Sequence, residues 1–207
     1  MFIFTRTRTI DPARAMDALT GATELSRTVE SLSDLSLSTW FQQYGPTGPA
    51  IRWTARLEHL EDYDKAFERL VASEAYHDAV AEVDELFIGM VTDDLLEVVA
   101  GDLPSTPTPI TASVQATAAN GHIRSAIHWG ADLAERFGRS LDVPTIFVRG
   151  LYGTYGTIAW GSFFDDINQV EGTHAKMATD EMLQAVIDEG AHNCQPGASA
   201  VLMRKLD

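Results

Sequence analysis

The chain has a single cysteine, Cys194, among its 207 residues, so it can form no internal disulfide. This scarcity is typical of proteins from reducing compartments, and we expect a cytoplasmic protein. A lone cysteine can serve as a nucleophile, and His192 is close by in HNCQPG, but an incidental loop thiol is the favoured interpretation. The chain also lacks any run of about 18 apolar residues, and MFIFTRTRT becomes polar too early for a signal peptide.

Basic residues are scarce as well, with 15 Lys and Arg against 30 Asp and Glu and a formal net charge of −15. Nucleic acids and anionic membranes require clustered cations, so we expect neither as a partner. Metal ligands are few and scattered. No two of the six histidines have the i, i+4 spacing of a helical metal site, and one cysteine cannot form a zinc tetrad. We therefore expect no metal.

One phrase occurs twice in the chain. YGPTGPAIRW at 44–53 and YGTYGTIAW at 152–160 both begin with Tyr-Gly, pass through a Gly-rich turn and end with Ile-x-Trp. The starts of the two phrases are 108 positions apart and their ends are 107 apart. LVASEAYHDAVAE at 70–82 aligns with KMATDEMLQAVID at 176–188 with an offset of 106. Such a stable offset indicates a duplicated unit of about half the chain.

Each half has the pattern of two strand-helix-strand segments in succession. The first half predicts strands at 2–10, 35–44, 50–58 and 95–101, a helix opened by Asp11-Pro12, and a helix at 60–87 with a break at Ser73. The second half repeats this order, which is that of a ferredoxin-like unit. DLPSTPTP at 102–109 has three prolines and is typical of a linker. We expect one unit at 1–101, this linker, and a second unit at 110–207.

The chain resembles the dimeric α/β-barrel superfamily, which includes antibiotic-biosynthesis-monooxygenase-like and NIPSNAP-like domains. The resemblance rests on the strand order and on an x-Trp-x strand followed by HLEDYDKAFERLVASEAYHDAVAE, which has an acidic helix start, an aromatic-bearing helix, a Ser-Glu break and Tyr76. It implies an α+β fold in which two tandem ferredoxin-like units pair their antiparallel sheets into one barrel. Members usually pair two chains, whereas the duplication here would supply both units, so we expect a monomer or a homodimer.

Aromatic residues gather around the two repeated turns. A flat aromatic ligand could lie among such rings, with tyrosine hydroxyls and tryptophan N–H groups orienting it. The competing interpretation is that they pack in the core, as most such rings do. The candidate substrate-binding residues are Trp129, Trp160, Tyr155, Trp40, Tyr44 and Trp53.

Three residues of the second half are candidate catalytic groups. His174 follows Gly172, where we expect the last helical region to be interrupted, and histidine titrates in the range a general base needs. Arg149 lies within the strand pattern IFVRGLY, where a guanidinium requires either a carboxylate or an anionic ligand oxygen. Tyr152 opens the second Tyr-Gly turn. The family resemblance leaves haem as an alternative, with His128 or His174 as axial ligand.

The favoured function is a small-molecule tailoring enzyme of secondary metabolism, a cofactor-independent oxygenase or cyclase/isomerase that acts on an aromatic polyketide-like substrate. One base would deprotonate an electron-rich phenolic substrate, and the carbanion would then react with oxygen or cyclise. The alternatives are a non-catalytic ligand-binding or assembly module and a haem-binding protein of the same fold. We expect the main cavity in the second half, because Tyr63, Phe67 and Leu70 are expected to fill the first.

Overall fold

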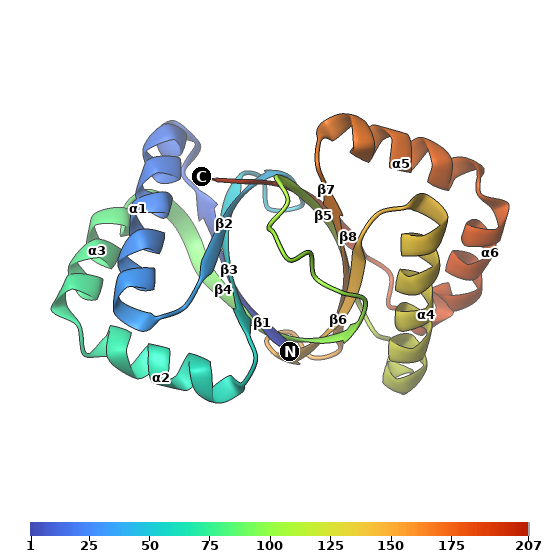
Figure 1. Ribbon diagram of the computed structural model, residues 1–207, viewed down its shortest axis with the longest axis horizontal. Helices are drawn as coiled ribbons and strands as arrows, with labels where there is room; N and C mark the ends of the chain where they lie inside the picture. The colour runs from blue at the N-terminus through green and yellow to red at the C-terminus, as the bar shows by residue number, and fades with distance from the viewer. Residues whose placement is uncertain (207) are drawn as a thin grey trace. The chain divides into compact units, whose positions relative to one another are not determined.

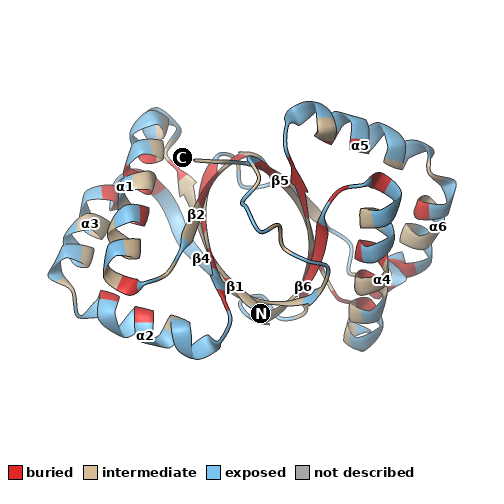
Figure 2. Ribbon diagram, in the orientation of Figure 1, coloured by how far each residue is buried: buried red, intermediate tan, exposed pale blue. Residues whose placement is uncertain are grey.

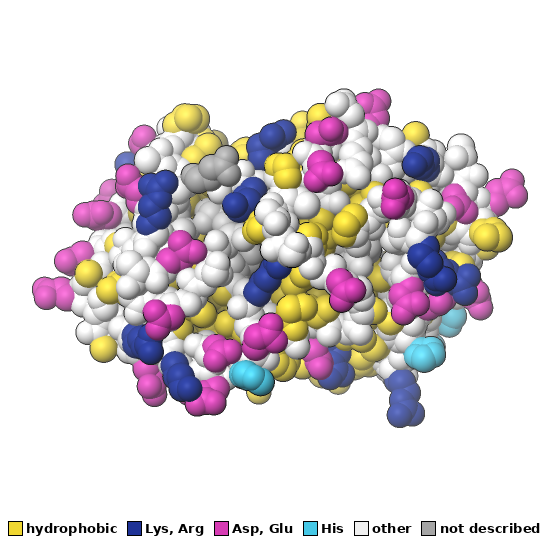
Figure 3. Space-filling view, in the orientation of Figure 1, with side chains coloured by type: hydrophobic (Ala, Val, Ile, Leu, Met, Phe, Trp, Pro, Cys, Tyr) yellow, Lys and Arg dark blue, Asp and Glu magenta, His cyan; other side chains and the backbone are white. Residues whose placement is uncertain are grey.

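The computed structural model describes residues 1–206, which divide into two compact units. The first consists of Met1–Leu96 together with the end of the chain from Arg204, and the second consists of Glu97–Met203. No helix in the described part of the chain is long and apolar enough to cross a bilayer. Acidic side chains are spread over the face shown in Figure 3, with no region of that face dominated by arginine or lysine.

Residues 1–206 form eight strands. They are β1 (Phe2–Ile10), β2 (Leu37–Tyr44), β3 (Ala50–Leu57), β4 (Phe87–Ala100), β5 (Ile110–Thr117), β6 (Thr145–Tyr152), β7 (Thr157–Phe164) and β8 (Ser199–Lys205). Their hydrogen-bonded order is β1-β3-β2-β8-β5-β7-β6-β4, which is a closed barrel. In each unit the central strand, β3 or β7, pairs antiparallel with both of its neighbours. The expected α+β fold of tandem ferredoxin-like units is confirmed.

Three helices cover one face of the sheet in each unit (Figure 1). In the first unit these are α1 (Ala15–Ser33), which follows a 3-10 turn at Pro12–Arg14, then α2 (Leu60–Val71) and α3 (Glu74–Asp84). In the second they are α4 (Ile123–Leu141), α5 (Ile167–Thr179) and α6 (Glu181–Gly190), which is followed by a 3-10 turn at Ala191–Asn193. The inner faces of these helices and the strands carry the buried residues, and the outer faces are exposed (Figure 2).

The two units repeat each other closely along the chain. Helices α1 and α4 are both 19 residues long and begin 108 positions apart. Each ends at an aspartate in the left-handed region, Asp34 with φ of 61° and Asp142 with φ of 53°. Aspartate tolerates this conformation better than most residues because its short polar side chain hydrogen-bonds locally. The same helix stop was therefore kept in both copies, again 108 positions apart.

The repeated tryptophan has the same structural role in both units. Trp53 on β3 donates its Nε1–H to the carbonyl of Ala22 in the middle of α1, at 3.3 Å. Trp160 on β7 donates to the carbonyl of Gly130 in the middle of α4, at 2.9 Å. In each case the indole N–H finds a main-chain acceptor, and the long helix is joined to the central strand.

The structure corrects the expected helix boundaries in the second unit. The break at Ser73 in the first unit is confirmed, because Ser73 caps α3 by accepting from the backbone N–H of Tyr76. In the second unit, however, α5 runs through Gly172 without interruption, and the break comes at Asp180. Asp180 is a better stop because its carboxylate accepts from the N–H of Leu183 at 3.0 Å. Glycine inside a helix weakens it without necessarily ending it.

Gly172 therefore offers a stabilising substitution. A methyl group added there would meet no atom within 4 Å, and the residue has ordinary helical backbone angles. We expect Gly172→Ala to raise the free energy of unfolding by about 0.5–1 kcal/mol, since glycine loses more backbone entropy on folding than alanine does. Urea denaturation followed by circular dichroism would measure the change. A decrease in stability would contradict the uninterrupted helix.

Candidate functional site

An apolar cavity of the second unit lies between its sheet and its helices. Its volume is about 430 Å³. Strands β5, β6 and β7 form the floor, and α4, α5, the end of α6 and the segment before β8 form the walls. Apolar side chains provide most of the surface, including Ala112, Val114, Leu133, Phe137, Met177 and Ile187. A cavity of this size, lined in this way, is typical of sites for small, largely apolar molecules.

Two tryptophans form one wall of this cavity. Trp129 from α4 and Trp160 from β7 meet edge to face, with ring centroids 5.3 Å apart. The Trp129 N–H donates to the carbonyl of Val186 at 2.9 Å, and the Trp160 N–H is bound to α4. Both donors are therefore used within the protein. The tryptophans offer a ligand their ring surfaces, and the expected orienting role of their N–H groups is not available.

A pair of hydroxyl groups supplies polarity on the cavity floor. Thr145 and Ser162 lie on adjacent strands, both are buried, and their side-chain oxygens are 3.1 Å apart. Thr145 donates its single hydroxyl proton to the carbonyl of Val143, also at 3.1 Å. Ser162 is therefore the donor within the pair, and its oxygen keeps lone pairs toward the cavity. The floor offers an acceptor, which suits a ligand hydroxyl.

Two further polar groups reach the cavity from its walls. His174 lines it from α5 and is exposed, which places the imidazole at the mouth. Gln195 lines it from the segment before β8 and donates one N–H to the carbonyl of Ala118 at 3.3 Å. The side-chain amide carries a second N–H, so Gln195 can also donate to a ligand oxygen. This residue has no distinguishing sequence pattern and was not among the candidates.

Cys194 also lines the cavity, and it is half-buried. Burial raises the pKa of the Cys194 thiol, because the charged thiolate is less well solvated there. The thiol form is therefore favoured at neutral pH, which makes this residue a poor nucleophile. Among residues 1–206, no cluster of three or more histidine, cysteine or acidic side chains is placed to hold a metal ion.

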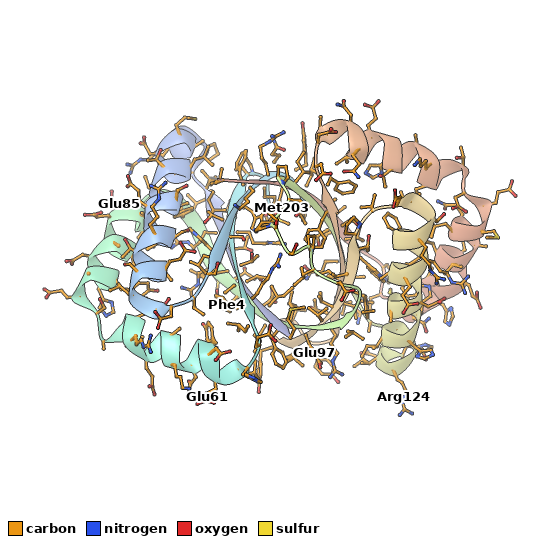
Figure 4. The ribbon with its side chains drawn as sticks, in the orientation of Figure 1. Phe4, Glu61, Glu85, Glu97, Arg124 and Met203 are labelled. Carbon is orange, nitrogen blue, oxygen red and sulfur yellow. The ribbon has the colours of Figure 1, made fainter. Side chains whose placement is uncertain are left out.

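The remaining candidates of the second unit lie elsewhere. Arg149 lies on β6 and forms an ion pair with Glu97 on β4 at 2.6 Å, in a separate depression at the β6–β7 turn (Figure 4 labels Glu97). The sequence predicted that Arg149 would pair either with a carboxylate or with an anionic ligand oxygen, and its partner is the Glu97 carboxylate. Tyr152 and Tyr155 are at the same turn and are 72% and 83% exposed. The structure thus brings Trp129, Trp160 and His174 together and separates them from these three residues.

The candidates of the first unit do not meet in one site. Trp53 lines a second cavity of about 300 Å³ between the sheet and helices of that unit. Trp40 is buried on the opposite face of the sheet, where its N–H donates to the Thr54 hydroxyl at 3.1 Å. Tyr44 is exposed at the β2–β3 turn. The expectation that Tyr63, Phe67 and Leu70 fill this unit is wrong, because all three line its cavity.

Comparison with known proteins adds evidence at the level of the fold. No protein-family model matches the chain, and no curated protein matches it in sequence. A candidate monooxygenase from Fusobacterium nucleatum matches 100% of this chain and 92% of its own, with a TM-score of 0.73 and 6% identity. An anthrone oxidase-like protein matches 100% of this chain and 91% of its own, with a TM-score of 0.71 and 12% identity.

The chain has the fold of the dimeric α/β-barrel superfamily. A haem-binding protein from Thermus thermophilus shares the fold more distantly, with a TM-score of 0.55, 15% identity, and coverage of 100% of this chain and 91% of its own. At such low identities the similarity shows the fold alone, and members of one fold carry different activities. The function must therefore be inferred from the side chains that line the cavities.

Proposed function

We propose that the protein is a cofactor-independent tailoring enzyme that oxygenates a planar, phenolic, polyketide-like substrate in the cavity of its second unit. The observation that carries this proposal is the cavity itself, an apolar space of about 430 Å³ whose polar groups are few and separated. The matches to a candidate monooxygenase and to an anthrone oxidase-like protein support an oxidative reaction. Cyclisation or isomerisation of a related substrate would begin with the same deprotonation.

The polar groups divide into the roles that such a reaction requires. A fused aromatic substrate would lie against Trp129 and Trp160, with a phenolic hydroxyl donating to the Ser162 oxygen. Gln195 would donate to the substrate carbonyl oxygen, on which negative charge accumulates after deprotonation. His174, at the mouth, would accept the proton from the activated carbon and pass it to solvent.

The proposed reaction balances with dioxygen as the only co-substrate. Loss of a proton from an activated CH2 group gives a resonance-stabilised carbanion. One-electron transfer to O2 and recombination of the two radicals form a C–O bond, and the oxygen then takes up a proton to give a hydroperoxide. Elimination of water leaves a ketone, so one oxygen atom enters the product and the other leaves as water. The apolar walls exclude water from the carbanion until oxygen reacts.

A suitable test uses 1,8-dihydroxyanthrone, which has phenolic hydroxyls, a carbonyl and an activated CH2 group in one planar molecule. We expect the protein to accelerate its conversion to the anthraquinone above the spontaneous rate, with one O2 consumed per product. We expect His174→Ala to lower turnover at least about tenfold, or roughly 1.4 kcal/mol of barrier. His128→Ala is the matched control, because His128 is exposed on α4 outside this cavity and should leave turnover unchanged.

A ligand-binding protein without catalysis is the second candidate. One observation favours it: His174, the expected base, is exposed at the mouth of the cavity and is not enclosed within it. Tight binding of the anthrone with no acceleration above the spontaneous rate would support this candidate. An absorption spectrum of the purified protein tests the haem alternative, because a Soret band would contradict a cofactor-independent reaction.

A further inference from the structure

The cavity of the first unit differs in chemistry from that of the second. Four strands and all three helices of the unit surround a space of about 300 Å³. Six aromatic side chains line this space, and Phe4 on β1, labelled in Figure 4, is among them. Phe4 and Tyr63 lie 4.6 Å apart between centroids, and Tyr63 stacks on Phe67 at 6.3 Å. These surfaces suit a flat aromatic ligand, as in the second unit.

Two arginines on β1 also line this cavity, and they differ in how they are paired. Arg6 donates from Nε and Nη2 to both oxygens of Asp93, at 2.8 and 2.7 Å. This two-point ion pair occupies one whole edge of its guanidinium and raises the pKa of Arg6. Arg6 is therefore largely satisfied within the protein.

Arg8 is the less satisfied of the two. It has one ion pair, from Nη1 to Asp84 at 2.7 Å, and its Nε is buried without a hydrogen-bond partner. The guanidinium lies over the Phe87 ring at 4.9 Å, which fixes its position. A guanidinium has five N–H donors, and leaving buried donors unpaired costs free energy. An anionic ligand oxygen in the cavity would relieve this deficit.

We propose that the cavity of the first unit binds an aromatic carboxylate, with its rings among the aromatic side chains and its carboxylate on Arg8. The lining carries two guanidinium groups and one carboxylate, Asp84, in a chain whose net charge is −15. The Asp84 side chain is 64% exposed, so solvent screens its repulsion of a second anion. Tyr63 adds a donor, because burial raises the pKa of its phenol and keeps it protonated.

This site is chemically distinct from the one proposed for catalysis. The cavity of the second unit has no arginine or lysine in its lining, and its floor presents a hydrogen-bond acceptor. The duplication would thus have given two cavities with different ligands, a phenol in the second unit and a carboxylate in the first.

Isothermal titration with 2-naphthoate and its neutral analogue 2-naphthalenemethanol tests the proposal. We expect the protein to bind the carboxylate at least about tenfold more tightly than the alcohol, as hydrogen bonds to a charged group are stronger than neutral ones. Arg8→Met should remove this preference and leave binding of the alcohol unchanged. Arg69→Gln removes the same charge from an exposed site on α2 outside the cavity and should have no effect. Ala112→Phe, which narrows the cavity of the second unit, should not change binding of naphthoate.

Asp84→Asn provides a second and opposite test. It removes a negative charge from the lining and frees the Nη1 of Arg8, so naphthoate should bind severalfold more tightly. This variant decides the matter if Arg8→Met fails to fold: tighter binding supports the proposal, and unchanged or weaker binding contradicts it. The proposal is also wrong if the protein binds neither probe, if it binds both equally, or if folded Arg8→Met keeps its preference for the carboxylate.

Discussion

Replacing Gly130 with alanine is expected to lower the free energy of unfolding by about 2–3 kcal/mol. Gly130 lies in the middle of α4, where a methyl group would overlap the ring of Phe147 on β6. That ring cannot move aside, because Phe147 is fully buried and packs on Trp160 with centroids 5.3 Å apart. Trp160 in turn donates to the Gly130 carbonyl, so a shift of the helix would also strain this hydrogen bond.

Gly138 on the same helix is the matched control for Gly130. A methyl group added there would have only an ordinary contact, at 3.5 Å from the Val143 carbonyl oxygen. Gly138→Ala should therefore stabilise the protein by about 0.5–1 kcal/mol, as alanine usually does within a helix. Urea denaturation of the two variants would measure both changes. Equal effects at the two sites would show that α4 does not pack against β6 as described.

Much of the fold could be predicted from the repeated phrase and from the periodicity of the chain. The Tyr-Gly turns mark the β2–β3 and β6–β7 hairpins, and the offset of 108 recurs in the paired helix stops at Asp34 and Asp142. These features are local, since a turn, a cap or a strand face depends on residues close together in sequence. The break expected at Gly172 was wrong, because a glycine weakens a helix without ending it, whereas Asp180, eight residues later, caps the start of α6.

The candidate sites were harder to predict, because they depend on which side chains meet across elements. Trp160 and Ser162 point to the same face of β7, so strand alternation places both, but only the structure brings Trp129, His174 and Gln195 to them. Likewise, the ion pair between Arg149 and Glu97, which are 52 positions apart, could not be predicted from the sequence. Tyr63 was expected to fill space that it in fact encloses, since a hydrophobic pattern does not distinguish filling a core from lining a cavity.

The identity of the ligand sites also depends on hydrogen bonds that composition cannot reveal. A tryptophan N–H is a plausible ligand donor until its backbone acceptor is known, and here Trp53, Trp129 and Trp160 all donate to main-chain carbonyls. With these donors occupied, the polar contacts proposed for a ligand in the second unit come from Ser162, Gln195 and His174. The two proposed sites therefore differ in their polar groups, since arginines line only the cavity of the first unit, although the sequence repeat predicts similar units.

Substituting phenylalanine for Ala112 is expected to lower anthrone turnover about a hundredfold, or roughly 2.7 kcal/mol of barrier. Ala112 lies on β5 and lines the cavity floor, where its pairing partner on β7 is Ser162. A benzyl side chain there would enter the space that a fused aromatic substrate needs and would cover the hydroxyl acceptor. Because the cavity already has about 430 Å³ of open volume, the ring should fit with little loss of stability.

Oxygen uptake and anthraquinone formation measure this effect, and thermal unfolding checks that the variant is folded. Ala178→Phe is the matched control, because Ala178 is exposed on α5 and outside the cavity lining. It should keep full turnover. A folded Ala112→Phe protein with unchanged turnover would place the reaction outside this cavity. Loss of turnover together with unchanged binding of 2-naphthoate would instead locate catalysis in the second unit and leave the cavity of the first unit as an independent site.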